Sequence, residues 1–247
     1  IDRGGEVVVM ATDVGGTTLG RPYASGAFDV GPNGLFAYTV TNPTRPGDLV
    51  VARTSDSGRR QEIFRTQLNE DLLAHKTIPD AQLLVAKSVG GWEIEGWLVL
   101  PPDHEPGDRH PLILEIHGGP FADYGPRFSA EVQLYAAAGY AVLYSNPRGS
   151  TSYGADFANE IHHNYPSQDY DDLMAITDAA IATGHIDENR LFVTGGSGGG
   201  VLTSWIVGKT DRFKGAVVAK PVINWISFVL TADAYTYFPT YWFSAMP

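Results

Sequence analysis

The sequence predicts an α/β protein in which a doubly wound parallel sheet follows a short all-β region. Two observations lead to this prediction. From residue 82 onward, strand-like apolar runs alternate with helix-like stretches, which is typical of a parallel sheet covered by helices. From residue 1 to about 66, short strand-like runs follow each other closely, which is typical of sandwiches, barrels and propeller blades.

In the all-β region, each expected strand is a short apolar or alternating run that ends at a turn. These strands are expected at residues 6–11, 27–30, 35–41, 49–53 and 61–64, with a proline-rich turn at 42–47. A region of roughly one blade cannot bury its own faces, because repeat architectures need neighbouring repeats. We therefore expect residues 1–66 to be the C-terminal part of a larger β domain.

Residues 67–81 are expected to form a linker, because they are polar and only partly helical in pattern. The region 82–247 then begins with a hairpin and continues as alternating strands and helices. The expected strands are 82–88, 92–100, 112–116, 140–145, 191–194 and 215–219, and the expected helices are 128–138, 170–183 and 198–207. Gly139 ends the first helix, and Asp169 is the expected N-cap of the second.

The run from Leu191 to Gly200 predicts a nucleophile elbow, because Gly-x-Ser-x-Gly directly follows a strand and precedes a helix. Gly195 and Gly199 supply the very small neighbours that a strained turn around Ser197 requires. The helix N-terminus favours the negative charge of an acyl-transfer intermediate. Rival glycine motifs fail, since neither the dinucleotide-binding nor the P-loop spacing of glycines is complete.

An oxyanion needs donors, and the chain offers several candidates. The N–H of Gly198, directly after the serine, is the first. The loop 117–120, His-Gly-Gly-Pro, follows a buried-type strand and can supply the second from its backbone. Tyr153 either offers a phenolic O–H or is an ordinary packed tyrosine. Arg148 is expected to belong to a structural ion pair.

A serine nucleophile also needs a base and an orienting acid. All seven histidines precede Ser197, and the only aspartates after it are Asp211 and Asp233. If both partners follow the serine in chain order, the triad is incomplete within these residues. The adjacent pair His162 and His163 points apart without a carboxylate at ligand spacing, so no metal site is expected.

Composition excludes several classes of function. The formal net charge of −11 argues against nucleic acid and anionic membranes as partners, and no apolar run has the length of a membrane span. The absence of cysteine excludes disulfides, thiolate catalysis and cysteine-based zinc sites, and it fits the cytoplasm and the periplasm equally well. Eight aromatic residues follow Val222, either as core packing or as the apolar wall of a substrate cleft.

Three runs of this chain resemble the prolyl oligopeptidase family of serine peptidases, in particular its acylaminoacyl-peptidase and dipeptidyl-aminopeptidase-like branch. They are Ile-His-Gly-Gly-Pro at 116–120, Asn-Pro-Arg-Gly-Ser-Thr-Ser-Tyr-Gly at 146–154 and Thr-Gly-Gly-Ser-Gly-Gly-Gly at 194–200. The segment 46–49 is similar to the last propeller blade of that family. The resemblance implies the end of a β-propeller at 1–66 and the N-terminal part of an α/β-hydrolase domain at 82–247.

The resemblance further implies a serine peptidase that hydrolyses short peptides, of acylaminoacyl or dipeptidyl type, through an acyl-enzyme on Ser197. The oxyanion donors would be the N–H of Gly198 with either the N–H of Gly119 or the O–H of Tyr153. No cofactor is implied. The family's Asp and His lie beyond Pro247, so we expect a fragment that needs the remainder of the same protein and is inactive alone.

Two other functions stay open at this point. A carboxylesterase shares the elbow and the glycine loop, and a non-catalytic propeller–hydrolase binding module shares the fold. Self-association into a homo-oligomer is also left open by the sequence.

Overall fold

The computed structural model describes residues 8–55 and 58–243 of the chain. The chain divides into two compact units: residues 1–80 with 125–133, and residues 81–124 with 134–247. The division after residue 80 lies one residue before the end of the expected linker, 67–81. Residues 125–133 belong to the first unit, although the sequence analysis counted them with the second domain.

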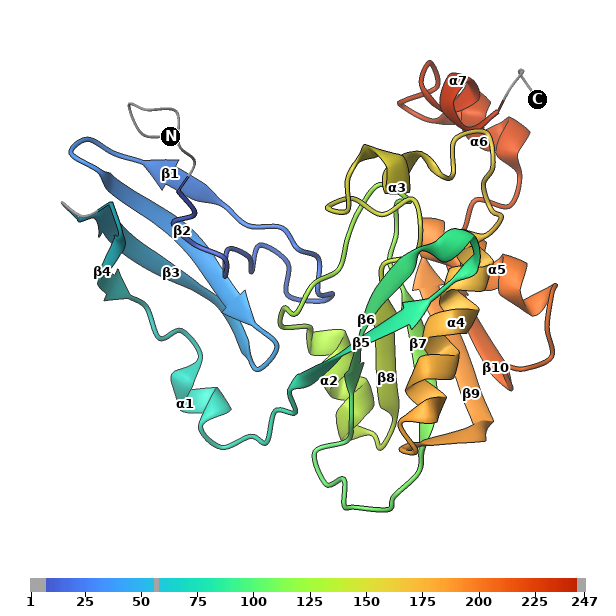
Figure 1. Cartoon of the computed structure of the whole chain (residues 1–247), viewed down its shortest axis with the longest axis horizontal. Coiled ribbons are helices and arrows are strands. Elements are labelled where there is room, and N and C mark those ends of the chain that lie inside the picture. Colours follow the sequence, from blue (N-terminus) through green and yellow to red (C-terminus); the bar gives the residue numbers. More distant parts are fainter. Residues whose placement is uncertain (1–7, 56–57, 244–247) are drawn as a thin grey trace. The chain divides into compact units, whose positions relative to one another are not determined.

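The first unit contains a four-stranded antiparallel sheet in the order β1-β2-β3-β4 (Figure 1). Its strands are β1 (Phe28–Val30), β2 (Leu35–Asn42), β3 (Arg45–Thr54) and β4 (Arg60–Arg65). Alternate residues of β2 and β3 point to one face, where Tyr38, Val40, Val50 and Ala52 form a small buried cluster. The four strands expected between residues 27 and 64 are therefore confirmed.

Two expectations for this unit are wrong. No strand forms at residues 8–11, and the rest of the expected strand 6–11 lies outside the described residues. The proline-rich turn is also shorter than expected, because β3 pairs Arg45 with Asn42. The side-chain oxygen of Asn42 accepts the N–H of Thr44 at 2.9 Å, which closes a turn of only two residues.

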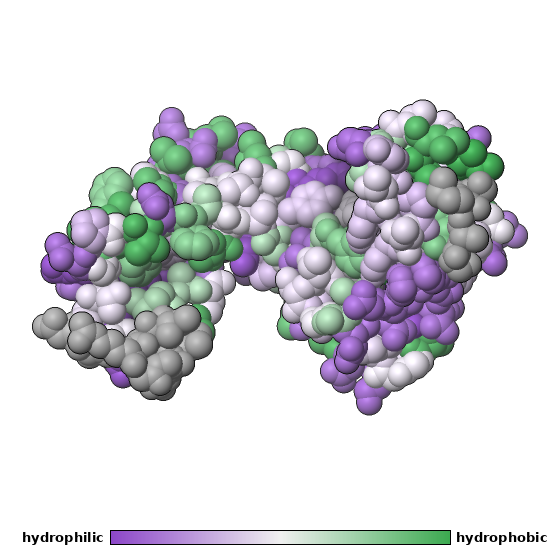
Figure 2. All heavy atoms as spheres, turned by 90° about the horizontal axis from the view of Figure 1, so that it is seen from above, coloured by the Kyte–Doolittle hydropathy of each residue, from purple (hydrophilic) through white to green (hydrophobic). Residues whose placement is uncertain are grey.

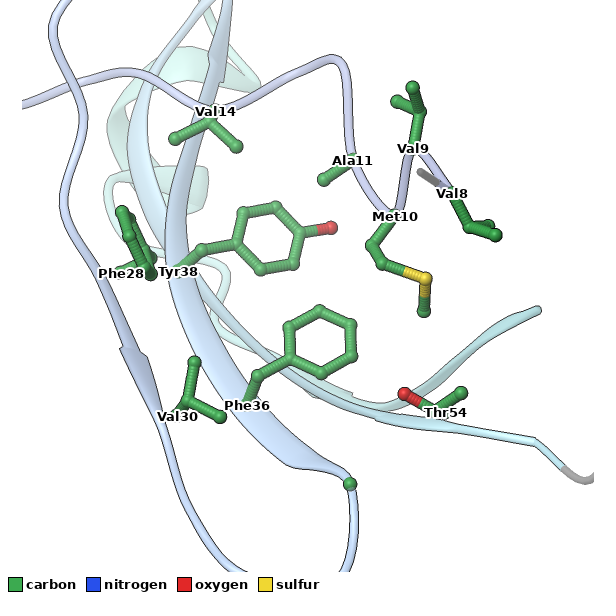
Figure 3. A pocket seen from close by; sticks show the side chains of 11 residues that line it. Val8, Val9, Met10, Ala11, Val14, Phe28, Val30, Phe36, Tyr38 and Thr54 are labelled. Carbon is green, nitrogen blue, oxygen red and sulfur yellow. The ribbon is translucent and has the colours of Figure 1, made fainter. Parts of the chain in front are cut away.

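An apolar groove of about 490 Å³ lies in this unit, along β1 and β2. Figure 3 shows Phe36 and Tyr38 in its lining, between Val30 on one side and Met10 on the other. Phe28 and Val30 remain 77% and 67% exposed. The groove fits a sheet that packs against neighbouring repeats, but membership in a larger propeller stays a prediction. Its described lining holds no histidine, carboxylate or amine.

The linker is partly helical, as predicted. It contains the single-turn helix α1 (Glu70–Leu73), and no residue of that helix is buried.

The second unit contains a six-stranded mixed sheet in the order β10-β9-β7-β8-β6-β5. Its strands are β5 (Ala81–Lys87), β6 (Glu93–Val99), β7 (His110–Ile116), β8 (Ala141–Ser145), β9 (Ile186–Gly196) and β10 (Gly215–Ala219). Strands β10, β9, β7 and β8 are parallel neighbours. The predicted hairpin of β5 and β6, joined through a short 3₁₀ turn (Val89–Gly91), adds two antiparallel strands at the other edge.

Helices cover both faces of this sheet, as a doubly wound fold requires (Figure 1). The helices of this part of the chain are α2 (Ala130–Ala137), α3 (Ala155–Asn159), α4 (Asp169–Ala182), α5 (Gly198–Val207), α6 (Trp225–Thr231) and α7 (Phe238–Trp242). Helices α4 and α5 share one buried cluster with alternate residues of β7 and β9. Tyr135 of α2 lies with Ile113 and Phe192, which point to the opposite face. None of the helices described is long and apolar enough to cross a membrane.

Asp169 is not the N-cap of α4, contrary to the sequence-based expectation. The cap position is Gln168, and Asp169 is the first helical residue. One oxygen of its carboxylate accepts the N–H groups of Ser167 at 2.7 Å and Tyr170 at 2.9 Å, so the side chain folds back on its own turn. The side chain is fully buried.

Replacing Asp169 by asparagine is expected to stabilise the fold at pH 8 and to change little at pH 4. Burial raises the pKa of Asp169 to about 7, above the roughly 3.9 of an unfolded aspartate. The folded chain therefore holds this proton more tightly. The contribution of this protonated carboxyl group to the free energy of unfolding is complete below about pH 4. It is lost as the pH rises toward 7. Asparagine keeps a side-chain oxygen that can accept these hydrogen bonds, but it does not ionise. Urea unfolding at both pH values measures the gain, a few kcal/mol in order of magnitude at pH 8.

The matched control is Asp171→Asn, in the same helical turn but only half-buried. It removes the same charge near the helix N-terminus without relieving a buried carboxylate. Equal, pH-independent effects of the two substitutions would contradict the assignment to Asp169.

Candidate active site

Ser197 occupies a sharp turn between β9 and α5. Its backbone has φ 59° and ψ −118°, a region that a residue with a β-carbon rarely adopts. The turn is fixed by the N–H of Ser197, which donates to the carbonyl of Ala219 at 3.0 Å. Ser197 is exposed, whereas Gly196 and Gly198 on either side of it are buried. Ser197 therefore has the backbone geometry expected of a nucleophile elbow and lies exposed at the carboxyl end of the parallel strands.

The two glycines that flank the elbow are sterically required. A β-carbon on Gly195 would lie 2.5 Å from the carbonyl oxygen of Gly199, and one on Gly199 would lie 2.1 Å from that of Ile116. Contacts this short do not occur for real β-carbons, so larger residues would force the backbone apart. Gly-x-Ser-x-Gly is thus dictated here by the approach of the helix start to β7 and β9.

The loop after β7 lies directly against the start of α5. A β-carbon on Gly198 would meet backbone atoms of Gly119 at 2.6 to 2.9 Å. Gly119 has φ 139°, in the range that favours glycine. The structure therefore brings together Ser197, Gly198 and Gly119, three of the residues singled out from the sequence.

His117 stabilises the loop after β7 through hydrogen bonds of its side chain, a role that the sequence analysis did not identify. Its ring is buried, its Nδ1–H donates to the carbonyl of Gly118 at 2.8 Å, and its Nε2 lies 3.0 Å from the hydroxyl of Ser150. Burial lowers the pKa of His117, so the ring is neutral at pH 7. His117 therefore connects the loop after β7 to the loop after β8, which carries Ser150.

The hydroxyl of Tyr153 takes part in a separate hydrogen-bond network. It donates to the carboxylate of Glu95 at 2.7 Å and accepts from the side-chain amide of Asn146 at 2.9 Å. Asn146 in turn bonds both backbone groups of Tyr124 at 2.8 Å. Burial raises the pKa of Tyr153, so its hydroxyl stays protonated. Arg148 on the same loop is buried and forms an ion pair with Asp172, as expected of a structural residue.

An aromatic cavity of about 260 Å³ opens beside Ser197. Five of the eight C-terminal aromatic residues line this cavity. They are Trp225, Phe228, Tyr237, Phe238 and Trp242. Figure 2 shows hydrophobic surface gathered at this end of the second unit, where Ile223, Ile226 and Leu230 are exposed.

Sequence reasoning missed Tyr165, which also lines this cavity. Its hydroxyl donates to the carbonyl of Gly198 at 3.2 Å, and its ring stacks on that of Trp242 with centroids 5.9 Å apart. No local pattern in the sequence marks this tyrosine, because its partners come from distant elements. Among the described residues of the cavity wall there is no histidine or carboxylate, so a base for Ser197 is not found in this lining.

Comparison with known proteins agrees with this geometry. A model of the prolyl oligopeptidase family matches residues 126–247, the segment that contains Ser197 and its helix. The chain belongs to the prolyl oligopeptidase family. The predicted family is thereby confirmed, and the matched segment contains two of the three runs that carried the resemblance, at 146–154 and 194–200.

Relatives of this family match most of the chain. The uncharacterized peptidase YuxL of Bacillus subtilis is 43% identical over 208 residues, 84% of this chain and 31% of YuxL. The acylaminoacyl peptidase of Pyrococcus horikoshii superposes with a TM-score of 0.77 at 28% identity, covering 87% of this chain and 34% of that one. An acylaminoacyl peptidase in complex with Z-Gly-Gly-Phe-chloromethyl ketone gives 0.78 at the same identity and coverage. The chain spans about a third of the length of these relatives.

Proposed function

We propose that this chain supplies the nucleophile, the oxyanion donors and part of the substrate cleft of a serine peptidase that acts on short peptides. The observation that carries the proposal is an exposed serine in a strained turn, between a helix N-terminus and an aromatic cavity. Membership in a family of peptidases supports peptides as the substrate class. The proposal requires a base from elsewhere in the full-length protein.

In this mechanism Ser197 Oγ attacks the carbonyl carbon of the scissile peptide bond and its proton passes to the base. The C–N bond then breaks, the amine leaves with that proton, and water hydrolyses the remaining ester on Ser197. The negative oxygen of each tetrahedral intermediate lies near the start of α5, where the helix dipole favours it. The N–H groups of Gly198 and Gly119 are the proposed donors.

Gly119 is a better second donor than Tyr153. The backbone of Gly119 touches that of Gly198 and both line the cavity with Ser197, whereas Tyr153 is absent from that lining. The O–H of Tyr153 already donates to Glu95, and losing that bond would leave a half-buried carboxylate poorly satisfied.

Replacing Tyr153 by phenylalanine is expected to lower kcat/KM by less than about tenfold. Removal of a true oxyanion donor costs about 10² to 10³ in kcat. Stability should fall by about 1 kcal/mol, because one partly buried hydrogen bond to each of Asn146 and Glu95 is lost. Steady-state kinetics on a peptide anilide and urea unfolding measure the two effects. A loss of several hundredfold in kcat with unchanged KM would instead assign the donor role to Tyr153.

The aromatic cavity is proposed to hold an apolar side chain of the peptide next to the scissile bond. Its wall is built almost entirely from apolar and aromatic side chains, which favours such residues over charged ones. The peptide chloromethyl ketone bound by one relative ends in Phe, which is consistent with this preference. We propose two specific activities for this site, the release of an acylated amino acid or the release of a dipeptide.

The direct experiment is labelling of the full-length protein with a fluorophosphonate, followed by peptide mapping. We expect one labelled residue, Ser197. Labelling of another serine, or none with the fold intact, would contradict the proposal. Turnover of a peptide anilide relative to a simple ester then separates a peptidase from a carboxylesterase, because only a peptidase must expel a poor amine leaving group.

A further inference from the structure

A second group of reactive side chains lies at the opposite end of the parallel strands from Ser197. His110 is the first residue of β7, and His185 directly precedes β9. Their backbones are joined by the N–H of His110, which donates to the carbonyl of His185 at 2.8 Å. β7 has 7 residues, each rising about 3.3 Å, and Ile116 at its far end pairs with Gly195 beside Ser197, so roughly 20 Å separate this group from the elbow. The group is therefore independent of the proposed peptidase site.

His104 reaches the same place from the loop between β6 and β7. Its Nδ1 lies 2.9 Å from Nε2 of His110, and its ring packs edge to face with that of His185 at a centroid distance of 4.8 Å. Asp108, on the same loop, brings a carboxylate oxygen within 4.8 Å of both ring nitrogens. Across the described parts of the chain, His104, Asp108 and His110 are the one group of this kind with ligand atoms so close together.

The spacing is close to that of a metal-bound set. Zinc binds imidazole nitrogen at about 2.0 to 2.1 Å in a tetrahedral arrangement, which places neighbouring ligand atoms about 3.3 Å apart. The ring nitrogens are slightly closer than this and the carboxylate is somewhat farther, so rearrangement by about 1.5 Å completes the set. The loop can make this change, because Asp108 is exposed and a β-carbon on Gly107 would touch nothing within 4 Å.

The local charge and the turn geometry also favour a cation. The N–H of Glu105 donates to one oxygen of Asp108 at 3.0 Å and holds the carboxylate on the side of the histidines. Asp103, Glu105 and Asp108 give this short loop three acidic groups, against Arg109 beside it. Two imidazoles with one carboxylate suit Zn²⁺ and similar transition metals, whereas Mg²⁺ and Ca²⁺ prefer oxygen ligands only.

We propose that His104, Asp108 and His110 form a binding site for a divalent transition-metal ion, Zn²⁺ in the first instance, with water completing the coordination. The ion ties the loop between β6 and β7 to the start of β7. Because the three ligands lie on one stretch of chain, the site forms within the second unit alone. Its role is structural, since it lies far from the proposed nucleophile.

The test is isothermal titration of the full-length, chelator-treated protein with ZnCl₂ at pH 7.5. We expect one equivalent of Zn²⁺ to bind and MgCl₂ to give no saturable binding. His104→Ala and Asp108→Asn should each weaken Zn²⁺ binding by more than about tenfold. Circular dichroism verifies the fold of each variant, and His104 on the exposed loop is the substitution best tolerated.

Two control variants separate this site from adventitious binding. His75→Ala removes an exposed histidine of the first unit and should leave the titration unchanged. His162→Ala removes one ring of the pair His162 and His163, whose centroids lie 3.9 Å apart with the rings tilted by 30°, so these side chains do not point apart as the sequence suggested. The proposal is overturned if the folded protein shows no saturable Zn²⁺ binding. It is equally overturned if binding is lost in His162→Ala but kept in His104→Ala.

Discussion

Replacing Ser197 by alanine in the full-length protein is expected to lower kcat/KM for a peptide anilide by about 10⁶-fold. The acyl-enzyme route depends on one oxygen atom, and no neighbouring hydroxyl occupies the strained turn. Alanine keeps the β-carbon that the backbone at φ 59° already accommodates, so the elbow itself should persist. The residual rate would come from the oxyanion donors and from substrate binding alone.

The matched control is Ser204→Ala, two turns further along the same helix. The hydroxyl of Ser204 donates to the carbonyl of Gly200 at 2.9 Å and does not line the cavity beside Ser197, so activity should stay within a factor of about two. Fluorophosphonate labelling should vanish in Ser197→Ala and remain in Ser204→Ala. A Ser197→Ala protein that is folded and still turns over peptide at more than a few per cent of the parent rate would refute Ser197 as the nucleophile.

The elbow could be predicted from sequence because its causes are local. Gly195 and Gly199 are required because the backbone approaches them closely, from residues nearby in sequence and from one adjacent strand. The strand before Ser197 and the helix after it also have clear apolar patterns. The buried strands of the second sheet were predictable for the same reason. Errors occurred where a side chain overrode a local pattern, as when Asn42 closed the turn before β3 early.

Side-chain partners from distant elements could not be predicted. Nothing near Tyr153 in sequence indicates that Glu95 accepts its hydroxyl, and nothing near Tyr165 places it under Gly198. The sequence analysis looked for a metal site only at adjacent histidines. It missed His104 and His110, six residues apart, because the loop between them had to fold back before their rings could meet.

Replacing Arg148 by methionine is expected to lower the free energy of unfolding by about 3 to 5 kcal/mol, the largest stability effect foreseen for this chain. Its guanidinium donates from Nε and Nη2 to the two oxygens of Asp172, both at 2.8 Å. It also donates to Gln168 at 2.7 Å and to the carbonyl of Val89 at 2.9 Å. Arg148 and Asp172 are both buried, so methionine would leave a carboxylate in the core without its cation.

The pair matters for the site because it fixes the loop after β8 to helix α4. That loop also carries Ser150, which lies 3.0 Å from the ring of His117 behind the glycine loop. Urea unfolding of Arg148→Met measures the stability loss. The double variant Arg148→Met with Asp172→Leu should recover most of it, because an apolar pair no longer buries an unpaired charge.

The exposed pair of Arg212 and Asp178 supplies the comparison, since Arg212→Ala should cost no more than about 1 kcal/mol. If Arg148→Met and Arg212→Ala prove equally mild, the buried ion pair does not hold this loop. If Arg148→Lys restores full stability, a point charge is enough and the two-pronged contact with Asp172 contributes nothing beyond it. We expect neither result, because a lysine ammonium cannot replace donors that diverge toward Asp172, Gln168 and Val89 at once.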